Sequence, residues 1–450
     1  MTTGRRLTAV VAVAAALLTV FALAPPAGAA PGTARYPEYW WDRWGVPDLW
    51  ASGHRGHGIT VAVVDTGVQR IPALAKVLVG GKDFTGLGGN GQTDRERDIF
   101  SHGTAMSSII AAQPSSKPML GTAPGASIMP LAVPLGGVRS TVETDRTAAA
   151  IDFASSHGAK IISMSFGARR NPILNAREPC PEDSQAAIFR ALVRGALLVA
   201  SAGNDGEQKS PVADPGVCLG VITAAATDAA NRVAGFSSRH GYVTVAAPGV
   251  NILSLNRNSD LFVGAGTSQA AALTSAALAL IWSAYPRESN RQISARLVGG
   301  AQDAGPAGRD RAYGYGLVNP GRSVRLRLTA STPNPVFAAA DPFLAQLKSA
   351  EQHLTAPAPV RAGPPGIARR GTEPGRSAAQ RALIGAAVAT LGLVGLLAAL
   401  WPRRRRRIEP VPAAGPWPPP PARLPPQGWT VPVAVPPPSG PEPGPPGSSH

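Results

Sequence analysis

Three short motifs, each centred on one side chain of a possible hydrolytic triad, occur in a fixed order along this 450-residue chain. They are Asp65-Thr66-Gly67, His102-Gly103-Thr104 and Gly266-Thr267-Ser268. A serine hydroxyl becomes a strong nucleophile only when an imidazole takes its proton, and the imidazole needs a carboxylate to hold its tautomer and stabilise its positive charge. Two other hydrolase folds carry these residues in the orders His, Asp, Ser and Ser, Asp, His. The order Asp, His, Ser therefore constrains the fold as well as the chemistry.

Apolar segments with the character of buried strands alternate with segments of helical character. Because such alternation produces a parallel sheet covered on both faces, the predicted fold class is α/β, with three layers around a mostly parallel central sheet. Functional side chains of these folds lie at the carboxyl ends of the strands. Strands are expected at 59–64, 128–133, 159–164, 196–200, 221–225 and 242–246, and helices at 106–112, 144–156, 185–194 and 268–283.

Both ends of the chain contain segments that are predicted to be targeting signals. Residues 1–29 combine a basic start, an apolar stretch and the small-residue pattern Ala27-Gly28-Ala29, which predicts a cleaved signal peptide; an uncleaved anchor is the alternative. Residues 382–401 are apolar and long enough to span a bilayer, and five arginines follow at 403–407. A buried core helix is the other interpretation of this stretch. We expect a single-pass plasma-membrane protein with its folded domain outside the cytoplasm.

Composition and charge divide the chain into six predicted segments. Much of the formal net charge of +16 comes from arginines in the C-terminal part, which favours membrane topology and solvation over a nucleic-acid partner. The segments are a signal peptide (1–29), an aromatic N-terminal arm (30–57), a folded domain (58–327), an extended linker rich in Pro, Ala and Arg (328–381), a membrane helix (382–401) and a basic, then proline-rich cytoplasmic tail (402–450).

The two cysteines and the acidic loops are candidate structural or metal-binding features. Cys180 and Cys218 would meet an oxidising compartment after export, where a pair is more often bridged than free; two buried thiols are the alternative. Two cysteines alone do not make a zinc site. Asp83, Asp94 and Asp98 are candidate calcium ligands, but the pattern fits solvated charge equally well. The sequence therefore predicts no metal or other cofactor.

Seven segments, in order along the chain, resemble the subtilisin-like serine proteases between residues 58 and 318. One such motif would be weak evidence, but seven in the family's order are specific. The segments are 61–68, 101–104, 161–167, 200–204, 236–238, 247–249 and 313–319.

The resemblance implies a subtilisin-like fold and an endopeptidase that works by acyl transfer on protein or peptide substrates. It assigns Ser268 as the nucleophile, His102 as the base and later the acid, and Asp65 as the carboxylate that orients the imidazole. The side-chain amide of Asn204 and the backbone N–H of Ser268 would bind the oxyanion. The start of a helix at Ser268 would add the positive end of the helix dipole.

Other positions define the substrate cleft or depart from the family. The resemblance places Ser165, Phe166 and Gly167 along the substrate-binding wall. Gln269 stands where the family usually has Met, and Ala272 where it usually has Pro. These departures leave open a second hypothesis, a non-catalytic scaffold of this fold that stabilises a membrane secretion complex. An aspartic-protease loop at Asp65 would need a second Asp-Thr-Gly or Asp-Ser-Gly motif, which the chain lacks.

The arrangement of segments resembles one branch of the family. An exported peptidase domain, a Pro-rich linker and one C-terminal span with a basic flank are similar to the mycosins, the membrane-anchored proteases associated with type VII secretion in actinobacteria. The cysteine pair on either side of Asn204 is similar to that group as well. The resemblance implies a type VII secretion complex as a partner.

Overall fold

The computed structural model describes residues 38–98, 100–135, 141–169, 180–206 and 213–355. The predicted signal peptide, the predicted span at 382–401 and the tail at 402–450 lie outside these residues, as does the part of the linker after residue 355. Among the helices that are described, none combines the length and the apolar character needed to cross a membrane.

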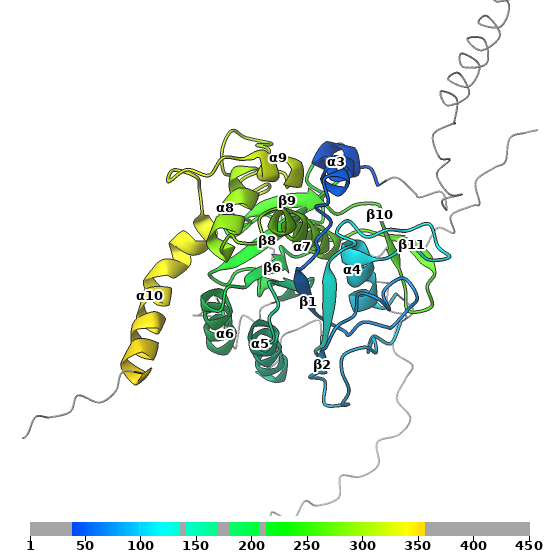
Figure 1. The fold of residues 1–450 in the computed structure, drawn as a ribbon, viewed down its shortest axis with the longest axis horizontal. Coiled ribbons are helices and arrows are strands. Elements are labelled where there is room, and N and C mark those ends of the chain that lie inside the picture. The colour runs from blue at the N-terminus through cyan, green and yellow to red at the C-terminus, as the bar shows by residue number, and fades with distance from the viewer. Residues whose placement is uncertain (1–37, 99, 136–140, 170–179, 207–212, 356–450) are drawn as a thin grey trace, which may run out of the picture. The chain divides into compact units, whose positions relative to one another are not determined.

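A seven-stranded parallel sheet runs through the described residues (Figure 1). Its order is β2-β3-β1-β4-β6-β8-β9, and every neighbouring pair is parallel. This confirms the α/β class with a mostly parallel sheet. The strands are β1 (Thr60–Asp65), β2 (Lys82–Asp83), β3 (Ser127–Ala132), β4 (Ile161–Met164), β6 (Leu197–Ser201), β8 (Val221–Thr227) and β9 (Val245–Pro248); the pairs β5 (Ala168–Arg169) with β7 (Ala213–Asp214) and β10 (Ile252–Leu255) with β11 (Leu261–Gly264) form two small antiparallel sheets.

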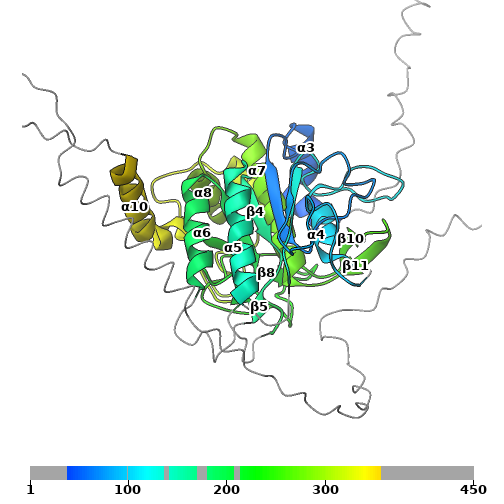
Figure 2. The same cartoon turned by 90° about the horizontal axis from the view of Figure 1, so that it is seen from below.

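Helices cover both faces of the sheet. Helices α5 (Thr141–Ser156) and α6 (Glu182–Val193) pack side by side against β1, β3, β4 and β6 (Figure 2). Helix α7 (Thr267–Ala284) contacts β4, β6, β8 and β9, and it also packs on α4 (His102–Ala111). Nearly every side chain of α7 is buried, as expected for a helix that is apolar all round. Every residue of β4, β6 and β8 is buried because both faces are covered.

Most of the predicted elements form within a few residues of their expected bounds. One difference is at the last strand, which the sequence predicts at 242–246 and which begins, as β9, at Val245. The backbone N–H of Val243 instead donates to the carbonyl of His240, 3.1 Å away, in a turn that precedes the strand. The backbone N–H of Thr244 then donates to the carbonyl of Thr223 at 2.9 Å, so residues 242–244 lead from this turn into the sheet.

The described part of the aromatic arm belongs to the folded body. Residues 41–51 form the short helices α2 (Trp41–Trp44) and α3 (Val46–Ala51). Trp40, Trp41, Trp44 and Trp50 are buried in the same core as the sheet. The indole N–H of Trp50 donates to the carbonyl of Thr122 at 3.1 Å. The arm therefore contributes core surface to the domain that it precedes.

The expected extended linker is wrong over residues 335–355, where helix α10 (Pro335–Thr355) forms. It follows α8 (Asn290–Gly299) and α9 (Pro320–Arg325). Val336, Phe337, Ala340 and Leu344 of α10 are buried in the core. These positions recur at helical spacing, so the helix has one apolar face that composition alone did not reveal. The guanidinium of Arg291 lies 4.3 Å from the centre of the Phe337 ring, so α10 packs against α8.

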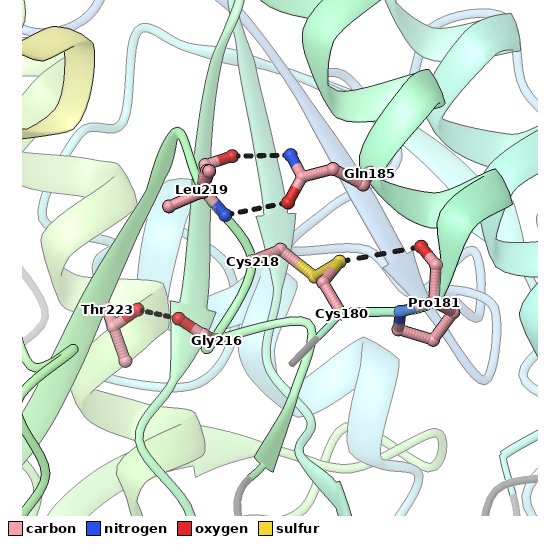
Figure 3. Close-up of a disulfide and its surroundings, with 7 residues drawn as sticks. All are labelled: Cys180, Pro181, Gln185, Gly216, Cys218, Leu219 and Thr223. Carbon is pink, nitrogen blue, oxygen red and sulfur yellow. Dashed lines mark hydrogen bonds between the residues drawn. A yellow bond between two sulfur atoms is a disulfide. The ribbon is translucent and has the colours of Figure 1, made fainter. Parts of the chain in front are cut away.

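A disulfide joins Cys180 and Cys218, as the cysteine pair predicted (Figure 3). It connects the start of α6 to the turn before β8, and the two Cα atoms are 5.0 Å apart. The Gln185 side chain forms two hydrogen bonds of 2.9 Å with the backbone of Leu219 in the same region (Figure 3). Closing a loop of 38 residues stabilises the fold by roughly 3–4 kcal/mol in the chain-entropy description.

Candidate active site

The predicted catalytic side chains meet at the carboxyl edge of the sheet. Asp65 is the last residue of β1, and Asn204 follows β6. The N-termini of α4 and α7 bring His102 and Ser268 to the same edge. A cleft of about 580 Å³ opens there, and its lining includes His102, Ser268, Ser165, Phe166 and Glu96. The fold thus brings the predicted nucleophile and base into one cleft.

Asp65 and His102 are paired directly. The His102 Nδ1 atom lies 2.8 Å from Asp65 Oδ1 and 3.0 Å from Oδ2. The Asp65 carboxylate is fully buried, and its Oδ1 accepts the backbone N–H of Thr66 at 2.8 Å. Because a carboxylate can only accept, Nδ1 carries a proton, and Nε2 is the basic atom of the neutral ring. This is the tautomer that a general base for Ser268 requires.

The surroundings of His102 favour its positive form. Burial of the ring disfavours that form, but Asp65, followed by Glu96 and Asp94, outweighs this effect and raises the pKa of His102 to about 9. The Asp94 carboxylate accepts the hydroxyl of Thr66 at 2.8 Å and the hydroxyl of Thr104 at 2.6 Å. Asp94 therefore ties the loop after β1 to the first turn of α4.

Glycines allow α4 to approach the end of β1. A Cβ added to Gly103 would lie 2.1 Å from the carbonyl oxygen of Gly67, a distance that no side chain tolerates. The backbone N–H of Gly103 donates to the Thr66 hydroxyl at 3.0 Å. Gly103 thus has a steric role, because it lets the helix that carries His102 approach Asp65.

Thr267 orients the amide of Asn204. The backbone N–H and the hydroxyl of Thr267 both donate to Asn204 Oδ1, at 2.9 Å and 2.8 Å. Because Oδ1 is engaged, the Nδ2 group is the one left for a substrate. A Cβ built on Gly266 would lie 3.5 Å from Asn204 Nδ2 and 3.7 Å from the Ser268 backbone nitrogen, so both nitrogens border one small space. Sequence reasoning missed this role of Thr267, although its place before Ser268 was a usable signal.

Little space is left beside the segment after β4 that lines the cleft. Ser165 and Phe166 line the cleft, and Gly167 follows them. A Cβ added to Gly167 would lie 3.0 Å from the Ala213 Cβ and 3.7 Å from the Gly203 Cα. The backbones that leave β4 and β6 therefore run close together, and the methyl group of Ala213 occupies the space beside them.

Gln269, one of the departures from the family pattern, is buried at the start of α7. Its side chain is 7% exposed and packs against the glycines of the preceding segment. A Cβ on Gly264 would lie 2.8 Å from Gln269 Nε2, and one on Gly266 would lie 2.7 Å from Gln269 Oε1. The Asp65–His102 pair forms with this glutamine in place.

The candidate calcium ligands have protein partners. Asp83 pairs with Arg95 at 2.8 Å and accepts the Thr85 hydroxyl at 2.5 Å, and Asp98 accepts the backbone N–H of Phe100 at 2.9 Å. Asp94 is bound to the two threonines described above. Within the described ranges, no group of three or more His, Cys, Asp or Glu side chains is arranged to hold a metal ion.

Comparison with known sequences gives the family. The sequence profile of the subtilase family (Peptidase_S8) matches residues 56–316, more than half of the chain. The chain belongs to the subtilase family, whose members are serine endopeptidases. It is 34% identical over 253 residues to the major intracellular serine protease of Bacillus subtilis, covering 55% of this chain and 76% of that protein. It is 32% identical over 273 residues (61% of this chain) to the minor extracellular protease Epr of Bacillus subtilis, but it spans only 39% of Epr.

Solved structures of two mycosins are similar to this chain. MycP1, described as a serine protease and an essential component of the type VII (ESX-1) secretion system, has a TM-score of 0.55 and 26% sequence identity, with 65% of this chain and 92% of that structure covered. MycP3 from the type VII (ESX-3) secretion system has the same TM-score and identity, with coverage of 66% and 90%. The resemblance to the mycosins predicted from sequence is thereby confirmed.

Proposed function

We propose that this protein hydrolyses peptide bonds by acyl transfer at Ser268. The observation that carries the proposal is the direct Asp65–His102 pair, whose histidine lines the same cleft as Ser268. His102 Nε2 takes the Ser268 proton as Oγ attacks the scissile carbonyl, and Asp65 stabilises the resulting imidazolium. His102 then protonates the leaving amine. A water molecule activated by the same ring hydrolyses the acyl-enzyme.

The oxyanion is stabilised at the N-terminus of α7. Asn204 Nδ2 and the Ser268 backbone N–H donate to it, and Thr267 keeps the amide in the required orientation. The positive end of the α7 dipole adds to this stabilisation. No side-chain cation is required, because the charge forms against groups that are already oriented before the reaction.

The substrate residue whose carbonyl is attacked has a short side chain in this proposal. That side chain would enter between the backbone of Ser165–Gly167 and the backbone before Asn204. The proximity of Gly167 and Gly203, together with the Ala213 methyl group, supports a preference for alanine, glycine or serine over large apolar residues at this position.

The site of action is the outer face of the plasma membrane. This part of the proposal rests on the signal peptide predicted at 1–29 and the span predicted at 382–401. The similarity to MycP1 and MycP3 supports an association with a type VII secretion complex, where the enzyme would process secreted protein substrates.

Active-site labelling tests the catalytic proposal. A fluorophosphonate probe is expected to label the purified protein, and the label should disappear in Ser268→Ala while the circular dichroism spectrum is unchanged. A folded protein that takes up no label would instead favour the scaffold hypothesis. Secretion measured in a deletion strain complemented with the wild type or with Ser268→Ala separates the roles further, because a scaffold would function without its serine.

A further inference from the structure

A second carboxylate, in addition to Asp65, is bound to His102. The Glu96 side chain accepts the backbone N–H of His102 through Oε2. This N–H is the first of α4 and has no acceptor within the helix. Glu96 also lines the cleft that contains His102 and Ser268. It therefore lies between the start of the histidine helix and the space that a substrate would fill.

The loop that carries Glu96 is held by Arg257, which lies between β10 and β11. Arg257 Nη2 donates to the backbone carbonyls of Glu96 and Asp98, and Arg257 Nε donates to the Ser101 hydroxyl at 2.6 Å. Ser101 precedes His102 and has a left-handed backbone with φ of 52°. The strand β10 is itself tied to α4, because the Leu255 N–H donates to the Ser108 hydroxyl at 3.0 Å. Arg257 thus braces the residues that lead into the histidine.

Glu96 and His102 interact through their charges as well as through the hydrogen bond between them. Burial of the Glu96 carboxyl raises its pKa to about 7, although the charge of His102 and its backbone N–H act in the opposite direction. An ionised Glu96 favours the imidazolium form of His102. The charged groups around the two residues are Asp65 at the end of β1, Asp94, Arg95, Arg97 and Asp98 in the loop, and Arg257. Arg95 and Arg97 line the same cleft as Glu96 and His102.

We propose that Glu96 is a positioning residue that fixes the entry into α4 and supports the positive charge of His102 during acyl transfer, with Arg257 as its brace. Asp65 stabilises the imidazolium directly, by accepting the hydrogen bond from Nδ1. Glu96 stabilises it through its nearby negative charge and holds the backbone N–H of His102. The kinetic part of the proposal rests on the proposed peptidase function. The effect on the titration of His102 does not depend on activity.

The Glu96→Gln variant tests the proposal, because glutamine keeps the shape and an acceptor oxygen but removes the charge. We expect the pKa of His102, followed by NMR titration of its ring protons, to fall by about one pH unit. The acidic limb of kcat/KM should move to lower pH by the same amount, since His102 must be neutral to accept a proton. The maximal kcat/KM, at the plateau of the pH profile, should fall about tenfold, because the imidazolium of the transition state is no longer stabilised by the Glu96 charge. A defect that was merely structural would lower the plateau without moving the limb.

Two variants serve as controls. Glu182→Gln makes the same chemical change on the exposed first turn of α6 and should leave both titration and rate unchanged. Glu96→Asp keeps the charge but shortens the reach, so the pKa of His102 should stay close to that of the wild type while the plateau drops. Loss of the His102 signal in His102→Ala assigns the resonance among the other histidines.

The outcomes separate this inference from the proposed function. An unchanged His102 titration in folded Glu96→Gln would overturn the inference, and so would a Glu96→Asp variant that titrates like Glu96→Gln. If the wild type shows no Ser268-dependent hydrolysis, the peptidase proposal fails, but the NMR titration still decides whether Glu96 is coupled to His102.

Discussion

In the proposed mechanism, the two ends of the cleft stabilise opposite charges by different means. The groups that raise the pKa of His102 are the carboxylates of Asp65, Glu96 and Asp94. Around the Ser268 backbone the groups are neutral donors, oriented by Thr267 and by the start of α7. Full negative charges suit an imidazolium. A cation placed to bind the oxyanion would lower the pKa of the nearby histidine. Oriented N–H groups bind the oxyanion without this effect, because they carry no net charge.

Removing the Asp65 charge at the acidic end of the cleft, beside His102, should cause the largest loss of activity. Asp65→Asn is expected to lower kcat roughly 10⁴-fold, because an amide can favour the wrong His102 tautomer and gives the imidazolium no charge. Steady-state hydrolysis of a peptide substrate measures this loss. Asp183→Asn, on the exposed first turn of α6, is the matched control. A loss below tenfold would mean that the acidic end does not act through Asp65.

Removing the side-chain donor at the neutral end, the Asn204 amide, should lower the rate less than removing the Asp65 charge. Asn204→Ala is expected to lower kcat roughly 10²–10³-fold with KM little changed, since the amide binds an oxyanion that exists only in the transition state. Stopped-flow measurement of acylation isolates the step. If KM rises while kcat is unchanged, Asn204 binds the substrate and does not stabilise the oxyanion.

Thr267→Val distinguishes orientation from donation at the neutral end. The variant keeps the shape and the backbone N–H but loses the hydroxyl that holds Asn204 Oδ1. Losing this hydrogen bond is expected to lower kcat by about 5- to 30-fold, corresponding to about 1–2 kcal/mol. Thr267→Ser retains the hydroxyl and should keep most of the rate. Equal losses in both variants would contradict the orienting role.

The smallest expected effect is on the preference for one substrate side chain over another, at the part of the cleft that lies between the two ends. Ala213→Gly removes the methyl group beside Gly167 and Gly203, so the kcat/KM ratio for leucine over alanine before the scissile bond should rise about fivefold, close to 1 kcal/mol. A set of peptides that differ at this residue measures the ratio. Ala230→Gly, in an exposed turn, should leave it unchanged. A wild-type enzyme that already prefers leucine would refute the narrow pocket.

The sequence singled out the proposed triad and Asn204, but not the residues that support them. Asp65, His102, Asn204 and Ser268 stand in short motifs beside glycines, and the strands before Asp65 and Asn204 were visible as apolar runs. Glu96 and Arg257 could not be identified in this way. Arg257 bonds to the backbone of residues about 160 positions away, and it stands in no motif. Glu96 bonds to His102 nearby in the chain, but it stands in no motif either. The linker was misread for a related reason: the apolar face of α10 is recognisable as core only when α8 is known to lie against it.

The sequence alone determined the α/β class, the order of the catalytic motifs and the pairing of the two cysteines, because each depends on local periodicity or on residue type. Only the tertiary structure decided how charge is distributed around His102, how Thr267 turns the Asn204 amide and how much room Ala213 leaves for a substrate. These properties depend on distances of 2–4 Å between segments that the parallel sheet brings to one edge, and such distances arise only when the whole core is packed.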